Sequence, residues 1–537
     1  MKTNTIVLRI SIALLLVLAP GLLLPSHAQE NAPTAQTNSG QLRGAARPGG
    51  GAEFLAIPYA QPPLGDLRWK APQPAIPWTG IRDAKAFGAA CAQPLLGGDW
   101  NKYDAKSSQE DCLFLNVITP VWPPQSPLPV MVWLHGGGNE GGSASSDLYK
   151  DGTLVNHGIL LVTVNYRLGI FGFFSHPALT AESPHHASGN YGLMDQIFAL
   201  QWVRQNIARF GGDPSNITLF GQSAGSQDTG ILMTSALSKG LFQRAIAESS
   251  SAFNPPQPTL AEAEALGTSF AATLKAPAGA AALKYLRQLS VQDLFAARAS
   301  LIPRPIFGPS IDGWVVAQSP AAVFQSGHEA AIPLLLGVTA REFGAQLFGT
   351  PTAPDELRKV IANYTGSLAP QAFAAYGLAD SGVGAFDPLH GSAADQWTAD
   401  LYFRCPAVTQ AEWHSAALHS TWEFEFAHAI PGQEAQGAVH SSDLPYVFGY
   451  FPKEGNIAGN FTDTDIKLAD LIESYWTNFA KTGNPNSAAL PQWPQLGASR
   501  NYIQFSQDGK VVTYTGLRAA QCACYRQTLE DRIKQSK

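Results

Sequence analysis

Short runs of apolar and β-branched residues alternate with segments of helical periodicity along most of this chain. Six runs have the composition of buried strands, and they are residues 130–134, 159–165, 217–220, 245–247, 333–338 and 422–426. The clearest helical patterns are residues 193–210 and 466–480. Because strands without a polar side must be covered on both faces, the alternation predicts an α/β fold with a large, mostly parallel central sheet and helices on both faces.

Composition limits the classes of protein to which the chain can belong. Of its 537 residues, 45% are hydrophobic and 14% are charged, against about 25% charged in an average soluble protein. That balance excludes disorder as the dominant state. The net charge is −6 and no basic block is present, so we expect no nucleic-acid partner.

Two alanine-rich helical stretches interrupt the alternation, at residues 255–330 and 351–418. We interpret them as helical insertions, of which the first could form a lid. Residues 501–515 alternate as a late hairpin. Length alone suggests several domains, but the single continued pattern favours one domain with insertions over residues 29–537.

The first 28 residues have the features of a secretory signal. Lys2 and Arg9 precede an apolar run, and small residues around Ala28 allow cleavage before Gln29. A membrane anchor is the alternative, but the apolar run is shorter than the about 20 residues that span a bilayer. We therefore expect an exported protein, periplasmic or secreted, with no stable membrane span after the signal is removed.

Export makes disulfide pairing the default for the five cysteines. Cys91 and Cys112 would close a loop of about twenty residues. Cys405 could pair with either Cys522 or Cys524, and one thiol is left over. Neither cysteines nor histidines show the spacing of zinc ligands, so the sequence predicts no metal and no organic cofactor.

The sharpest local motif is Gly-Gln-Ser-Ala-Gly at residues 221–225. It follows the expected strand 217–220 and opens a helical segment, 224–237. A serine on such a tight strand-to-helix turn projects its hydroxyl above the sheet, and small neighbours are needed because side chains there would strike the backbone. Ser223 is therefore predicted to be a nucleophile. The alternative is a Gly/Ser loop that only caps a helix.

Backbone donors for an oxyanion are expected from two places. The N–H of Ala224 lies at a helix N-terminus, where the helix dipole favours negative charge. The run His135-Gly136-Gly137-Gly138 follows the expected strand 130–134, and consecutive glycines let N–H groups face a ligand. A plain flexible loop is the alternative.

A serine nucleophile needs a base and an orienting acid, which follow it in the order Ser, acid, His. Glu342 lies just past the strand 333–338 and is the favoured acid, with Asp312 as its competitor. His440 lies in a glycine-containing loop and is the favoured base. His414, His419 and His428 lie in helix-like or strand contexts, which favour structural roles.

These residues sit within two long motifs of a known family. Residues 210–225 read FGGDPSNITLFGQSAG and residues 110–120 read EDCLFLNVITP. Similar stretches extend from about residue 36 to about residue 530, including HSSDLPYVF at 440–448. The chain resembles the type-B carboxylesterases, the carboxylesterase/cholinesterase group of the α/β-hydrolases.

The resemblance implies roles for individual residues. Ser223, Glu342 and His440 match the catalytic triad, and Gly137, Gly138 and Ala224 match the oxyanion-hole donors. Cys91 with Cys112 matches the first disulfide of the family, and Cys405 with Cys522 its last, although Cys524 leaves the second choice open. Asp443 matches an acidic position that supports the histidine loop.

Three positions depart from the family pattern. Gln222 stands where cholinesterases carry Glu, so a cationic choline ester would lack a nearby negative charge. Asn139 stands where an aromatic residue is usual, which predicts a more polar substrate pocket. Trp100 lies in the first disulfide loop and is interpreted as a pocket or packing aromatic, not as a cation site.

The predicted function is hydrolysis of small-molecule carboxylic esters through an acyl-enzyme. One alternative is a non-catalytic binding protein of the same fold, which normally lacks one or more triad residues. Others are a lipase with a lid or a hydrolase of bulky esters. The sequence leaves the natural ester and the oligomeric state open.

Overall fold

An eleven-stranded sheet organises the fold in a computed structural model, which describes residues 32–95, 102–380 and 382–535. Its strand order is β14-β13-β12-β11-β10-β9-β7-β8-β6-β4-β3. The strands of this sheet are β3 (Ala45–Ala46), β4 (Ala52–Pro58), β6 (Phe114–Thr119), β7 (Leu128–Leu134), β8 (Leu160–Val164), β9 (Gly212–Gln222), β10 (Arg244–Glu248), β11 (Leu334–Thr339), β12 (Thr421–Phe426), β13 (Asn501–Phe505) and β14 (Val511–Thr515). A small second sheet contains β1 (Thr34–Gln36), β2 (Gln41–Arg43) and β5 (Ile81–Asp83).

Seventeen α-helices are present among the described residues. They are α1 (Lys102–Ser107), α2 (Asp147–Lys150), α3 (Gly169–Phe173), α4 (Pro177–Glu182), α5 (Tyr191–Asn206), α6 (Ala224–Leu232), α7 (Leu260–Thr273), α8 (Ala281–Gln288), α9 (Val291–Ala299), α10 (Pro320–Gln325), α11 (Pro354–Thr365), α12 (Ala369–Ala375), α13 (Ala393–Ala399), α14 (Cys405–Ala416), α15 (Leu444–Phe448), α16 (Asp463–Thr482) and α17 (Ala519–Gln535). A π-helical turn, Asp400–Arg404, joins α13 to α14.

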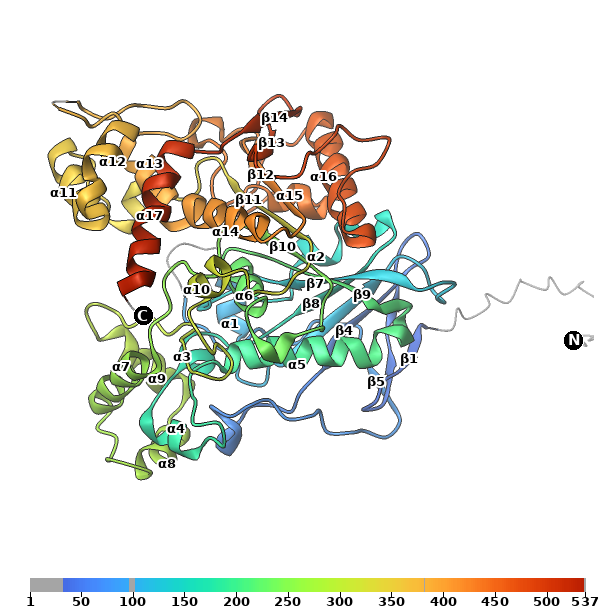
Figure 1. Ribbon diagram of the computed structural model, residues 1–537. Coiled ribbons are helices and arrows are strands. Elements are labelled where there is room, and N and C mark those ends of the chain that lie inside the picture. Colours follow the sequence, from blue (N-terminus) through green and yellow to red (C-terminus); the bar gives the residue numbers. More distant parts are fainter. Residues whose placement is uncertain (1–31, 96–101, 381, 536–537) are drawn as a thin grey trace, which may run out of the picture. The chain divides into compact units, whose positions relative to one another are not determined.

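Both faces of the central sheet are buried, as the apolar strands require. Side chains alternate between the two faces of a strand, and β7 divides accordingly. Val130 and Val132 belong to a core that includes α5 and α6, whereas Met131 and Trp133 belong to a core that includes α15 and α16. Figure 1 shows α5 and α16 on opposite sides of the strands. The predicted fold class is therefore confirmed.

The strands at the centre of the sheet run parallel, and this brings several loops to one edge. β8, β7, β9, β10, β11, β12 and β13 pair in parallel in that order. Their carboxyl ends therefore open on the same side, where ligands of α/β sheets bind. The segments that follow β7, β9 and β11 carry the predicted oxyanion loop, nucleophile and acid.

The sequence did not predict the antiparallel part of the sheet. β3, β4, β6 and β8 pair antiparallel, with a register shift in β4 between Phe54 and Ile57. The late hairpin is present as β13 and β14. The helix expected over 193–210 ends as α5 at Asn206 and continues as a 3-10 turn, Ile207–Phe210.

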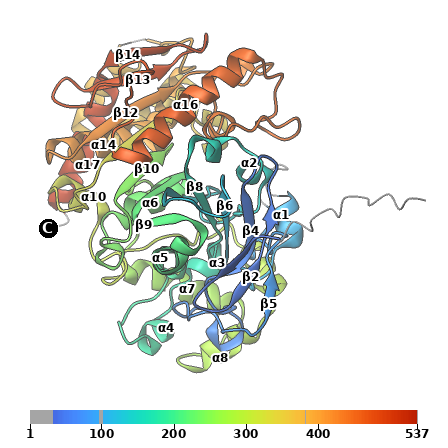
Figure 2. The same cartoon turned by 90° about the vertical axis from the view of Figure 1, so that its right-hand side faces the viewer.

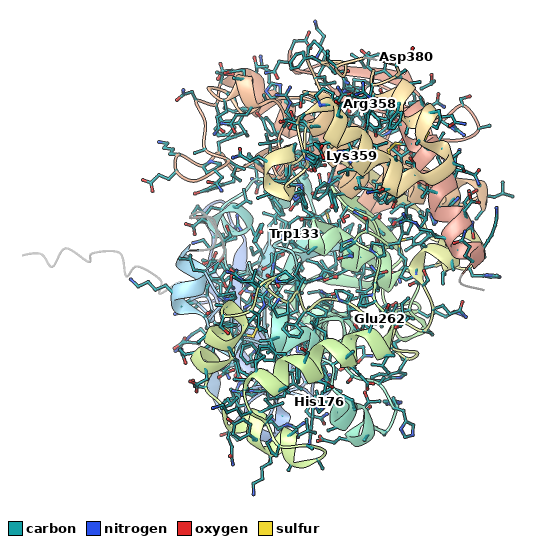
Figure 3. All side chains as sticks on the ribbon, turned by 90° about the vertical axis from the view of Figure 1, so that its left-hand side faces the viewer. Trp133, His176, Glu262, Arg358, Lys359 and Asp380 are labelled. Carbon is teal, nitrogen blue, oxygen red and sulfur yellow. A yellow bond between two sulfur atoms is a disulfide. The ribbon has the colours of Figure 1, made fainter. Side chains whose placement is uncertain are left out.

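The alanine-rich stretches are helical. Residues 255–330 contain α7, α8, α9 and α10, and residues 351–418 contain α11, α12, α13 and α14. Figure 2 shows α7 and α8 at the opposite end of the molecule from β13 and β14. Figure 3 likewise separates Glu262 on α7 from Arg358 and Lys359 on α11. The helix α14 departs from a simple insertion, because its Ala407 and Val408 pack in the same core as Leu334 and Leu336 of β11.

Two disulfides cross-link the chain. Cys91 pairs with Cys112 across 21 residues, and Cys405 pairs with Cys522 across 117 residues. Cys524 is a buried free thiol, so the structure chooses between the two partners that the sequence left open for Cys405. Disulfides are consistent with an exported protein. The expected signal segment, residues 1–28, lies outside the described residues. Among those described, we find no helix with the length and hydrophobicity that crossing a bilayer requires.

Candidate active site

Ser223 occupies a sharp turn between β9 and α6. Its φ of 55° and ψ of −122° are strained for a residue with a side chain. Two close approaches explain the flanking glycines. A Cβ on Gly221 would lie 2.5 Å from the carbonyl of Gly225, and one on Gly225 would lie 2.0 Å from the carbonyl oxygen of Leu134. Only glycine at both positions lets β9, α6 and the end of β7 meet at this turn.

Three backbone N–H groups near this turn are free to bind an anion. Gly137 and Gly138 adopt positive φ angles of 114° and 65° in the loop after β7. Ala224 begins α6, so its N–H has no intrahelical acceptor. Among the described residues, none of these three N–H groups donates a hydrogen bond. The loop is held by Tyr166, whose hydroxyl donates to the carbonyl of His135 at 2.6 Å.

Glu342 and His440 meet although 98 residues separate them in sequence. His440 Nδ1 lies 2.5 Å from Glu342 Oε2, and the backbone N–H of His440 donates to the carbonyl of Glu342 at 3.1 Å. The other oxygen of Glu342 accepts from the N–H of Thr339 at 2.9 Å. Both side chains are buried. The carboxylate therefore fixes the ring with its proton on Nδ1 and a lone pair on Nε2.

That lone pair faces Gln222, the residue before Ser223. Gln222 Nε2 lies 3.1 Å from His440 Nε2 and 3.0 Å from Ser441 Oγ, so the amide can donate to both. Ser223 Oγ itself has no hydrogen-bond partner among the described residues. His440 Nε2 therefore lies next to the turn that carries Ser223, and its hydrogen-bond partner in this structure is the amide of Gln222.

A buried acidic group lies behind the histidine. Neither carboxylate oxygen of Asp443 has a hydrogen-bond partner among the described residues. Burial and the charge of Glu342 together raise the pKa of Asp443 from 3.8 to about 7. Glu248, whose carbonyl accepts from the N–H of Ser223 at 2.8 Å, also has a raised pKa because of burial and Asp443. Sequence reasoning did not single out Glu248, because its only local context is the end of a buried strand.

An aromatic wall flanks the histidine ring. We use this name for Phe343, Phe348, Tyr402 and Phe403. The rings of Phe343 and Phe403 lie 4.3 Å and 4.9 Å from that of His440, measured between centroids. Phe348 stacks on Tyr402 at 4.4 Å and is 38% exposed. Because these residues come from two distant segments, the sequence alone did not connect them with the site.

Asn139 lies beneath the glycine loop. It is 1% exposed, and its amide donates to Asp228 on α6 at 2.9 Å. Gln196 donates to the other oxygen of Asp228 at 2.6 Å, and burial raises the pKa of Asp228 to about 7. Asn139 thus ties the loop to α6. The polar pocket expected from this residue stays a prediction, and Trp100 lies outside the described residues.

The competing acid and histidines have other partners. Asp312 accepts from the N–H groups of Trp314 and Val316 and so holds a turn. His428 lies 2.9 Å from Asp465. His414 and His419 both approach Glu329.

Comparison with known proteins places this geometry in a family. A family model described as "Carboxylesterase family" matches residues 31–525. The chain belongs to the carboxylesterase family. This membership implies the α/β-hydrolase fold, in agreement with the central sheet.

Several similar proteins are named as esterases. "Fumonisin B1 esterase" of Sphingopyxis macrogoltabida is 34% identical, over 91% of this chain and 88% of that protein. "Liver carboxylesterase 1" of Oryctolagus cuniculus is 34% identical, over 89% and 91%. "Para-nitrobenzyl esterase" of Bacillus subtilis (strain 168) is 36% identical, over 85% and 91%. This carboxylesterase-family chain is a carboxylic ester hydrolase, and its substrates are small-molecule esters.

Proposed function

We propose that the hydrolase works through an acyl-enzyme on Ser223, with His440 as base and Glu342 as the orienting acid. The observation that carries the proposal is the contact of His440 with both Glu342 and the residue that precedes Ser223. When substrate enters, the amide of Gln222 keeps Ser441 as its acceptor and yields His440 Nε2 to the serine hydroxyl.

The proposed chemical steps use the serine, the histidine, the glutamate and backbone N–H groups. His440 takes the proton of Ser223 as its oxygen attacks the ester carbonyl, and the Glu342 carboxylate stabilises the charged ring. The N–H groups of Gly137, Gly138 and Ala224 bind the oxyanion, and each such donor is worth roughly 3 kcal/mol in comparable sites. The ring then protonates the leaving alcohol, and water repeats the attack on the acyl group. None of these steps requires a metal or an organic cofactor.

The aromatic wall supports a preference for esters with an apolar group. It continues from His440 to the exposed ring of Phe348, so an apolar acyl or alcohol group there would be removed from water. The residue next to the nucleophile is the neutral Gln222, which gives a cationic ester no advantage. The relatives named for fumonisin B1 and para-nitrobenzyl esters suggest that bulky esters be tested beside simple ones.

Substitution of Ser223 and His440, two of the three proposed triad residues, tests the mechanism. Ser223→Ala, His440→Ala and the double variant should each lower kcat for p-nitrophenyl acetate by about 10⁴–10⁶. Because the two residues act as a unit, the double variant should lose little more than either single one. A folded Ser223→Ala protein that keeps a large share of the activity would refute the assignment of Ser223 as the nucleophile.

We also propose that residues 1–28 are a signal peptide and residues 29–537 one catalytic domain, exported to the periplasm or the medium. Residues 33–537 form one compact unit, and the disulfides suit an oxidising compartment. N-terminal sequencing of the exported protein should begin at Gln29. A start at Met1 would contradict the proposal.

A further inference from the structure

A cluster of ligand-type side chains lies outside the active site. Glu329 precedes β11, His414 lies in the last turn of α14, and His419 lies in the turn that leads into β12. Glu329 and His414 are fully buried as side chains, and the side chain of His419 is 16% exposed. Figure 1 shows α14 beside β11 and β12.

The three side chains direct single atoms at one point. His414 Nδ1 lies 2.7 Å and His419 Nδ1 lies 3.3 Å from Glu329 Oε1. The two nitrogens are 3.3 Å apart. Two nitrogens at this separation, each about 2.0–2.1 Å from a zinc ion, subtend about 104–111° at the metal, which is near the tetrahedral value.

The hydrogen bonds around the cluster determine which ring nitrogen of His414 faces Glu329, and they leave one oxygen of Glu329 without a partner. His414 Nε2 lies 2.9 Å from the carbonyl oxygen of Ile332, which can only accept. The proton of a neutral His414 ring is therefore on Nε2, and its Nδ1 presents a lone pair to a carboxylate. A carbonyl on the far nitrogen of a histidine is the usual orientation of a metal ligand. Glu329 Oε2 is buried and has no partner among the described residues.

Other histidines of the chain are arranged differently. His390 meets Glu425 with Nε2 and Asp387 with Nδ1, so its two carboxylates lie on opposite sides of the ring. His157 meets the buried Glu473 at 3.1 Å without a second histidine. Among the described residues, only Glu329, His414 and His419 form a group of three possible ligands.

We propose that Glu329, His414 and His419 bind one zinc ion. The carboxylate and two imidazoles are the ligands that zinc prefers, and the partly exposed side of His419 admits a water as the fourth ligand. Zinc binding would widen the 2.7 Å separation between His414 Nδ1 and Glu329 Oε1 by about 0.6 Å to reach tetrahedral spacing.

The site is structural and not part of the ester chemistry. Glu329 and His419 precede the amino ends of β11 and β12, whereas Glu342 follows the carboxyl end of β11. The six-residue strand β11 therefore separates the proposed zinc site from the candidate active site by about 20 Å. The ion ties the entry points of two neighbouring parallel strands to α14. His414 and His419 are five residues apart, and Glu329 lies 85 residues before His414, so two segments of the chain supply the three ligands.

Metal content and thermal stability test the proposal on the full-length exported protein. The protein is stripped with a chelator, incubated with zinc, desalted and analysed for zinc by mass spectrometry. Wild type should retain about one zinc per chain, and zinc should raise Tm by about 2–4 °C. Cobalt(II) in place of zinc should give the visible absorption of a tetrahedral site.

Two variants and a matched control assign the ligands. His419→Ala changes a partly exposed side chain, and Glu329→Gln keeps the shape of a buried one. Both should lose zinc retention and the Tm rise while keeping esterase activity. His157→Ala also removes a partly exposed histidine beside a buried glutamate, and it should behave as wild type. Wild-type protein that retains no zinc, or a His419→Ala protein that retains as much as wild type, would overturn the site.

Discussion

Gly225→Ala probes the close approach that positions Ser223, the proposed nucleophile, against the proposed oxyanion loop. The new Cβ would lie 2.0 Å from the carbonyl oxygen of Leu134 and 2.9 Å from that of His135. Both are backbone atoms, so no side chain can rotate away. Restoring even a tight contact of 3.0 Å requires a movement of about 1 Å between α6 and the end of β7. A misplacement of that size costs about 100-fold in rate, and overpacking costs about 1–3 kcal/mol of stability.

The assay is kcat/KM for p-nitrophenyl acetate together with the free energy of unfolding. Gly308→Ala is the matched control, because a Cβ there meets nothing within 4 Å and the residue has no positive φ. We expect Gly225→Ala to lose about 100-fold in kcat/KM and Gly308→Ala to keep wild-type values. If Gly225→Ala retained both activity and stability, the described packing of the turn at Ser223 against the end of β7 would be contradicted.

Four further changes have defined outcomes. Gln222→Glu places a carboxylate beside His440 Nε2 and so favours the protonated ring. The acid limb of the plot of kcat/KM against pH should therefore shift to higher pH by about 0.5–1 unit. A shift to lower pH would contradict the contact between residue 222 and His440. Asp443 has its pKa raised to about 7, so the folded chain keeps a proton that the unfolded chain releases above about pH 4. This group therefore lowers stability as pH rises from 4 to 7, by at most about 4 kcal/mol, and Asp443→Asn should flatten that part of the Tm–pH curve. Phe348→Ala should lower kcat/KM for esters with long acyl chains more than for the acetate ester. An equal loss for both would contradict a contact between Phe348 and the substrate. Replacing both Cys405 and Cys522 with Ala opens a loop closed over 117 residues and should cost up to about 5 kcal/mol of stability relative to the disulfide-bonded wild type, measured by denaturant unfolding.

The sequence predicted what depends on local pattern. The turn around Ser223 could be read because β9, the two glycines and α6 are contiguous. Glu342 and His440 were harder to choose among their competitors, because each lies far from Ser223 in the sequence and had to be recognised from its local context alone. The antiparallel strands β4 and β6 were missed. β4 is bent by its register shift, and its pattern of burial is irregular.

Groups brought together from distant segments left no trace in the sequence. The aromatic wall joins residues 343–348 to residues 402–403, and the proposed zinc ligands join residue 329 to residues 414–419. The raised pKa values of buried acids such as Asp228 and Glu248 could not be predicted from the sequence either, because they depend on burial and on partners that only the fold supplies.

The most direct test of the proposed mechanism is the site of covalent labelling by a fluorophosphonate. Such a probe reacts with a serine only when a base and an oxyanion hole activate it. Peptide mass spectrometry should place one adduct per chain on Ser223, with the loss of ester hydrolysis in proportion to labelling. The Ser223→Ala protein should take up no label. An adduct on another residue that abolishes activity, or full activity after Ser223 is labelled, would contradict the account.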